Sequence, residues 1–117
     1  MSSTDDAQPE SLPGRFKDFI DRYPELGQAH QAIGRAAEAA GPLDRKTIEL
    51  IKVGLSIGAG LETATRSHVR QAMQHGATEA EVEQVALLAY NTCGWPRMVM
   101  AWTWVRHQLE RANHPSR

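Results

Sequence analysis

The sequence predicts an all-α protein, a compact bundle of about six helices. Three observations lead to this fold class. Apolar residues recur at helical spacing, no segment alternates strictly between apolar and polar residues, and β-branched residues never cluster as they do in strands. Glycine and proline residues also separate the periodic segments, which is typical of positions where helices end and begin.

The first two predicted helices are separated by a proline. Residues 13–22 carry an apolar face, and Pro24 suits the first turn of a second helix that is rich in alanine. Gly41 and Pro42 end this second helix near residue 40, because glycine favours a helix stop and proline cannot continue the helix.

The third and fourth predicted helices cover about residues 44–59 and 62–75 and meet at a glycine-rich corner. Gly54 and Gly58 lie one turn apart in the third helix and would let another helix approach closely. Gly76 suits a left-handed cap after the fourth helix. The apolar residues of the third helix cover more than one stripe, which predicts burial on most sides: Ile48, Leu50, Ile51, Leu55 and Ile57.

The fifth and sixth predicted helices follow a capping box formed by Thr78 and Glu81. The fifth helix stops near Gly94, and Cys93 lies within its apolar pattern, so we expect this thiol to be a small buried hydrophobe. Pro96 suits the first turn of the sixth helix. The apolar stripe of that helix predicts core or a subunit interface: Met98, Trp102, Val105 and Leu109. Three tryptophans make this face large for so small a domain, which favours oligomerisation.

Length and composition narrow the classes of function. The chain has 117 residues and a mass of 13.0 kDa, which predicts one domain over residues 13–112, with a disordered N-terminal tail (1–12) and a C-terminal fringe (113–117). The 13 basic and 14 acidic residues are dispersed and give a net charge of -1, which disfavours nucleic acid as a partner.

Targeting, membrane and disulfide signals are not found in the sequence. The first residues do not form a signal peptide, and apolar stretches break well before the roughly 20 residues that a membrane span needs. We therefore expect a cytoplasmic protein without a membrane partner. The single cysteine, Cys93, excludes an internal disulfide framework and any Cys-x-x-Cys site within the chain.

The residues best suited to chemistry flank the corner between the third and fourth helices. Glu49 lies 11 residues before Gly60, and His68 lies 8 residues after it, or about 16 and 12 Å along the two helix axes. These distances allow the two side chains to face each other across antiparallel helices. The pair suits either a structural hydrogen bond or an acid–base site. Because no histidine spacing around His68 suits a zinc ion, neither a metal nor another cofactor is expected.

Three segments give the chain a resemblance to a known family. Residues 42–51, 67–72 and 76–82 resemble the carboxymuconolactone decarboxylase family, which includes the alkyl hydroperoxide reductase D proteins, and the resemblance covers about residues 24–110. The peroxidase branch carries Glu, eleven residues, Cys, two residues, Cys, three residues and His. On this chain the Glu and His fall on Glu49 and His68, but the two thiol positions fall on Leu61 and Ala64. Dithiol peroxidase activity, which needs a thiolate, is therefore disfavoured.

The decarboxylase branch is similar to this chain because it also keeps the histidine without the cysteine pair. The resemblance implies release of CO2 from a small acidic cyclic or lactone-type metabolite, followed by proton delivery to carbon. An imidazole, with an ordinary pKa of about 6.5, suits this last step. In this hypothesis His68 is the acid, Glu49 its partner, and Arg66 or Arg70 the ligand of the substrate carboxylate.

Two further expectations concern assembly and an alternative role. The resemblance implies a homo-oligomer, a trimer or a hexamer, with the tryptophan-rich last helix in the contacts. The alternative to an enzyme is a non-catalytic oligomeric binding or scaffold protein that keeps the fold without the chemistry. A solvent-connected pocket around His68 and Glu49 would favour catalysis, and a sealed, hydrogen-bonded pair would favour the scaffold.

Overall fold

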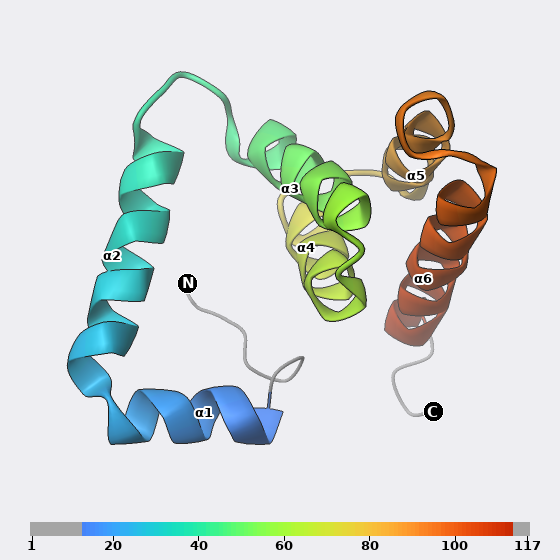
Figure 1. The fold of residues 1–117 in the computed structure, drawn as a ribbon. Helices are drawn as coiled ribbons and strands as arrows, with labels where there is room; N and C mark the ends of the chain where they lie inside the picture. The colour runs from blue at the N-terminus through green and yellow to red at the C-terminus, as the bar shows by residue number, and fades with distance from the viewer. Residues whose placement is uncertain (1–12, 114–117) are drawn as a thin grey trace. The chain divides into compact units, whose positions relative to one another are not determined.

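A computed structural model describes residues 13–113, and these residues form six helices and no strand (Figure 1). The predicted N-terminal tail and residues 114–117 lie outside the described part. The helices are α1 (Pro13–Arg22), α2 (Pro24–Ala39), α3 (Arg45–Ala59), α4 (Glu62–Gln74), α5 (Glu79–Cys93) and α6 (Trp95–Asn113). The all-α prediction is confirmed, and the predicted ends of the first four helices fall within one residue of the observed ends.

The chain divides into two compact units between Leu43 and Asp44. The first unit contains α1 and α2, and the chain turns sharply between them at Tyr23 (Figure 1). The two helices pack tightly at Gly27 of α2, where a Cβ atom would lie 2.5 Å from the Cδ1 atom of Ile20. The absence of a side chain on Gly27 therefore lets Ile20 of α1 pack against the start of α2.

The second unit consists of two helical hairpins, α3–α4 and α5–α6. α3 packs against α4 and α5, and α4 packs against α6. Gly60 (φ +75°) and Gly94 (φ +93°) make the two hairpin corners, in a backbone region that side chains with a Cβ rarely adopt. The core between the helices is built from small and β-branched residues with a few larger ones: Val53, Ile57, Val69, Ala72, Ala77, Val82, Ala86, Ala89, Met98, Ala101, Val105 and Leu109.

Side-chain caps begin α3 and α5. The Oδ1 atom of Asp44 accepts a hydrogen bond from the Thr47 backbone N–H at 2.8 Å, and this bond lowers the pKa of Asp44 below its ordinary 3.8. The predicted capping box is confirmed: Thr78 Oγ1 accepts from the Glu81 N–H at 3.1 Å, and Glu81 Oε1 accepts from the Thr78 N–H at 2.9 Å. The pKa of Glu81 is lowered, first by this backbone bond and then by Lys46, which donates to it at 3.1 Å.

Arg97, in the first turn of α6, caps the end of α3 from the other hairpin. Its Nη1 atom donates to the backbone carbonyls of Ile57 at 2.9 Å and Gly58 at 3.0 Å. A cation at this helix end also complements the partial negative charge of the last carbonyls. The sequence offers no local signal for this contact, since its two ends lie about 40 residues apart in the chain.

Arg106 joins the start of α5 to the end of α6. It donates to Glu83 at 2.6 Å, Glu79 at 3.3 Å and Glu110 at 3.4 Å, and these carboxylates, Glu83 first, raise its pKa. Asn113 donates to Glu79 at 3.1 Å, and the pKa of Glu79 is lowered by this bond and then by Arg106. The network ties the two helices of the hairpin together at the end opposite to Gly94.

One prediction about burial is wrong. α3 is buried on one side only, because α4 and α5 cover that side while Ile51 and Leu55 remain 44% and 68% exposed within the chain. In α6 three residues of the predicted stripe, Met98, Val105 and Leu109, are buried in the core, whereas Trp102 lies at the edge of the buried face with 42% of its surface exposed. Periodicity identifies a face, but the helices that cover it decide which edge of that face is buried.

The predicted close approach at the α3 glycines is looser than expected. A Cβ atom on Gly54 would lie 3.6 Å from Val85 Cγ1, and one on Gly58 would lie 4.0 Å from Cys93 Sγ, both of them ordinary contacts or longer. Both neighbours belong to α5, so α5 does pass over these glycines without needing them to lack side chains. Among residues 13–113, no helix is both long and apolar enough to cross a membrane.

Candidate active site

Glu49 is a buried carboxylate in the middle of the second unit. It lies on the α3 face that also carries Val53, Ser56 and Ile57, at helical spacing, and this face packs against the neighbouring helices. Only 2% of Glu49 is exposed. Because a buried carboxylate is costly unless it is paired, its partners indicate what it does.

His68 provides the first partner, from α4. Its Nδ1 atom lies 3.0 Å from Glu49 Oε1, which confirms that the two side chains face each other across the antiparallel hairpin. The histidine side chain is 29% exposed, and its Nε2 atom makes no hydrogen bond within residues 13–113. The pair thus combines a sealed carboxylate with an imidazole that reaches solvent.

Arg45 provides the second partner, and the sequence reasoning missed it. Its Nη2 atom donates to Glu49 Oε2, so the carboxylate has a different partner on each oxygen. Arg45 is the first residue of α3 and its side chain is 41% exposed. Its spacing from Glu49, four residues along one helix, is the signal that could have found it.

Arg66 and Arg70 lie on the other side of α4 from Glu49. Residues two apart, such as Arg66 and His68, are separated by about 200° around a helix, and Arg70 follows Arg66 by one turn. Arg66 donates from Nε and Nη2 to Glu62 Oε2, at 3.0 and 2.8 Å. Its Nη1 atom is buried without a hydrogen-bond partner among the described residues. The structure therefore joins His68 to Glu49 and does not bring either arginine to them within one chain.

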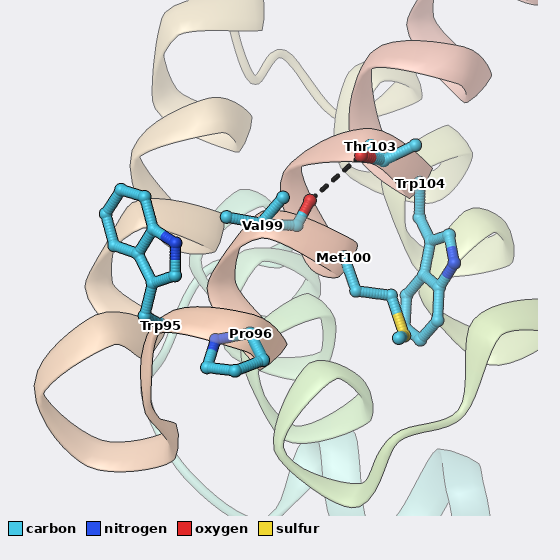
Figure 2. A pocket seen from close by; sticks show the side chains of 6 residues that line it. All are labelled: Trp95, Pro96, Val99, Met100, Thr103 and Trp104. Carbon is cyan, nitrogen blue, oxygen red and sulfur yellow. Dashed lines mark hydrogen bonds between the residues drawn. The ribbon is translucent and has the colours of Figure 1, made fainter.

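Two hollows of the second unit lie away from this pair. The first, about 450 Å³, runs along α6 between the indoles of Trp95 and Trp104 (Figure 2). A hydrogen bond joins the Thr103 hydroxyl to the Val99 carbonyl at 2.9 Å, and no charged side chain lines the hollow. Few groups are therefore available there to orient an acidic substrate.

The second hollow, about 330 Å³, lies between α3 and α5. It is lined mainly by apolar side chains, and Cys93 is among its lining residues. Neither hollow is lined by His68 or Glu49. The Glu49–His68 pair therefore reaches solvent through the partly exposed imidazole, and it lies in neither of these two hollows.

The prediction that Cys93 is buried is wrong, because its thiol is exposed. Cys93 ends α5, and the residue beneath it on α3 is Gly58, which has no side chain to cover the sulfur. Gly58 follows Glu49 by nine residues, or about 14 Å along the α3 axis, so the thiol lies far from the Glu49–His68 pair within one chain.

The two thiol positions of the peroxidase motif lie at the start of α4. Leu61 is the N-cap residue of this helix, and Ala64 lies one turn before His68. A thiol at position 64 would thus be a neighbour of the imidazole, and this chain has a methyl group there. Within residues 13–113, no three His, Cys, Asp or Glu side chains gather closely enough to hold a metal ion.

Comparison with known proteins gives a match to one family model, described as the carboxymuconolactone decarboxylase family, over residues 24–107. The chain belongs to this family. The matched region includes Arg45, Glu49 and His68, and it contains all of α3, α4 and α5. The resemblance inferred from the sequence motifs is therefore confirmed.

Two curated proteins are similar in sequence to this chain. An uncharacterized protein of Haemophilus influenzae is 39% identical over 57 residues, which cover 49% of this chain and 50% of the relative, so the chain spans half of that protein. An uncharacterized protein of Cupriavidus necator is 28% identical over 97 residues, which cover 77% of this chain and 86% of the relative. No solved structure matches the chain.

Proposed function

We propose that the chain is a small acid–base enzyme, a lyase-like catalyst acting on a small acidic cyclic or lactone-type metabolite. The observation that supports this most directly is the 3.0 Å contact between the sealed carboxylate of Glu49 and the solvent-reaching ring of His68. A buried acceptor on one ring nitrogen leaves the other nitrogen to exchange a proton with a substrate. In this proposal His68 is the catalytic acid, and Glu49 is the residue that orients it.

The proposed reaction is loss of CO2 from a carboxylated lactone. The bond between the ring carbon and the carboxylate breaks, and its electron pair moves into the conjugated lactone. CO2 leaves, and the protonated imidazolium form of His68 delivers its Nε2 proton to carbon, which leaves the neutral ring with its remaining proton on Nδ1 until solvent protonates Nε2 again. A site that is partly withdrawn from water favours the first step, because the substrate loses a localised charge as CO2 forms.

Arg66 or Arg70 holds the substrate carboxylate in this proposal. Because both arginines lie across α4 from Glu49, they would meet a substrate at His68 from a neighbouring copy of the chain rather than from the same helix. The arginine role therefore requires the homo-oligomer, a trimer or a hexamer, that the family resemblance implies.

The exposed apolar surface of the second unit is consistent with such an assembly. Large apolar side chains are exposed on α3, α5 and α6: Ile51, Leu55, Leu87, Leu88, Trp95, Val99, Met100 and Trp102. Exposed apolar surface on this scale is typical of an interaction site. Light scattering at micromolar concentration should give the mass of three or six chains, and the mass of one chain would contradict the assembly.

A substrate screen tests the activity. A panel of carboxylated lactones and related cyclic acids is incubated with wild type, His68→Ala, Glu49→Gln and the control His107→Ala, which removes an exposed imidazole from α6. Loss of the proton donor should lower turnover by about 10²–10⁴-fold in His68→Ala, with a smaller loss in Glu49→Gln. Turnover that is equal in wild type and His68→Ala would contradict the proposal, and His107→Ala should match wild type.

The second candidate is a non-catalytic oligomeric binding or scaffold protein. It is favoured by the position of both hollows away from His68 and by the full pairing of Glu49. In that case His68→Ala would lower the stability of the fold, since Glu49 would lose a partner, while no member of the panel would be turned over by the wild type.

A further inference from the structure

The two oxygens of the Glu49 carboxylate contact side chains from two different helices. Oε1 contacts His68 Nδ1 at 3.0 Å across the hairpin, while Oε2 accepts from Arg45 Nη2, one turn earlier on α3. With only 2% of Glu49 exposed, water cannot readily replace either partner. The orientation of the carboxylate is therefore set by these two contacts together.

The state of this carboxylate determines which nitrogen of His68 carries the proton in the neutral ring. An ionised carboxylate only accepts hydrogen bonds, so the ring nitrogen facing it must be N–H. A protonated carboxyl group would instead be able to donate its O–H to that nitrogen and reverse the arrangement. Burial alone disfavours the ionised form, whereas an adjacent guanidinium, which is always charged, favours it.

We propose that Arg45 is a positioning residue of this site: it holds Glu49 as a fixed, ionised acceptor and so keeps the His68 proton on Nδ1 and the lone pair on Nε2. Arg45 acts through Glu49, because its Nη2 atom donates to Oε2 of that carboxylate, whose other oxygen contacts the imidazole. Nε2 has no hydrogen-bond partner within residues 13–113, so it is the nitrogen that exchanges protons. The consequence for catalysis rests on the proposed function, but the tautomer itself does not.

The tautomer can be measured without a substrate. Long-range ¹H–¹⁵N spectra of ¹⁵N-labelled protein distinguish the two neutral forms of a histidine ring, and the His68 signals are identified by their loss in His68→Ala. The spectra are recorded where the ring is neutral, for wild type, Arg45→Met, Arg45→Lys and Arg106→Met. The last variant is a matched control, since Arg106 also bonds to a glutamate but at the α5–α6 end of the unit.

We expect nearly all of the wild-type His68 ring to carry its proton on Nδ1, and roughly half or less of it in Arg45→Met. Arg45→Lys, which keeps the charge, should retain the wild-type form, and Arg106→Met should leave His68 unchanged. A wild-type ring with its proton on Nε2, or an Arg45→Met spectrum identical to wild type, would overturn the proposal. If Arg45→Met fails to fold, Arg45→Gln, which is neutral and suited to the start of a helix, carries the same expectation.

The activity screen separates this proposal from the proposed function. A wild-type protein that turns over no lactone acid but shows the Arg45-dependent tautomer contradicts only the function. A protein that is active through His68 but shows an unchanged tautomer in Arg45→Met contradicts only the role of Arg45. Where activity is found, Arg45→Met should lower kcat with little change in KM, because Arg45 acts on the orientation of the acid and not on substrate binding.

Discussion

Replacing Arg97 by methionine tests the link between the first turn of α6 and the end of α3. The substitution keeps an unbranched side chain of similar length, so packing along the stem is largely preserved. It removes the guanidinium, and with it the two hydrogen bonds to the carbonyls of Ile57 and Gly58. The change in stability then reports on the hydrogen bonds and the charge.

The expected loss follows from the surroundings of the two carbonyls. The bond to Ile57 is partly buried, and breaking a charged bond of this kind costs about 1.5–3 kcal/mol. The bond to Gly58 is exposed, so water replaces much of it. Loss of a cation from a helix C-terminus adds about 0.3–1 kcal/mol. We expect a total destabilisation of about 2–4 kcal/mol and a fall in Tm of at least about 10 °C.

Thermal and urea unfolding, followed by far-UV circular dichroism at one fixed protein concentration, measure this change. Lys17→Met is the control, because it removes the cation of an exposed i,i+4 pair with Asp21 and should change stability by less than about 0.5 kcal/mol. Arg97→Lys should recover part of the loss. A change of less than about 0.5 kcal/mol in Arg97→Met would refute the reasoning.

A double-mutant cycle with Gly60→Ala sharpens the test. A Cβ atom on Gly60 would lie 3.1 Å from Arg97 Nη1, and the φ of +75° disfavours alanine in any case. In the wild-type background, Gly60→Ala should therefore cost about 1 kcal/mol of backbone strain and also part of the free energy of the Arg97 hydrogen bonds. In the Arg97→Met background only the backbone strain remains. Effects that add within about 0.5 kcal/mol would show that Arg97 does not hold this corner.

Three further predictions concern acid stability, peroxide and the core. The pKa values of Glu79 and Glu81 lie below their ordinary 4.5 in the folded chain, so their contribution to stability is present above about pH 4.5 and is lost as pH falls through the folded values. The unfolding midpoint, measured as a function of pH, should show this fall. A flat profile from about pH 5 to 3 would contradict the prediction. Peroxide consumption with dithiothreitol should be absent in both wild type and Cys93→Ser, and turnover that disappears in the variant would place the exposed thiol in a mechanism. Leu109→Ala should destabilise the fold by about 2–5 kcal/mol in urea unfolding, since the side chain is 1% exposed, and a loss below 1 kcal/mol would mean that this end of the core collapses around the cavity.

The helices and the first contact of the candidate site follow from local sequence patterns. Helix ends depend on residues within one turn, such as the proline at the start of α2 and the reciprocal bonds of Thr78 and Glu81, so they can be found from local patterns. The Glu49–His68 contact was also within reach, because a tight corner between two helices fixes which positions face each other.

The covered faces of the helices and the contacts between distant groups depend instead on how the helices pack. The exposure of Cys93 depends on the glycine beneath it on α3, and the exposure of Trp102 depends on how α6 is rotated against its neighbours. Arg97 reaches carbonyls about 40 residues away, for which the chain carries no local signal. Periodicity and capping act within a few residues, whereas burial and long-range hydrogen bonds depend on how the helices pack, and a single sequence does not specify that packing residue by residue.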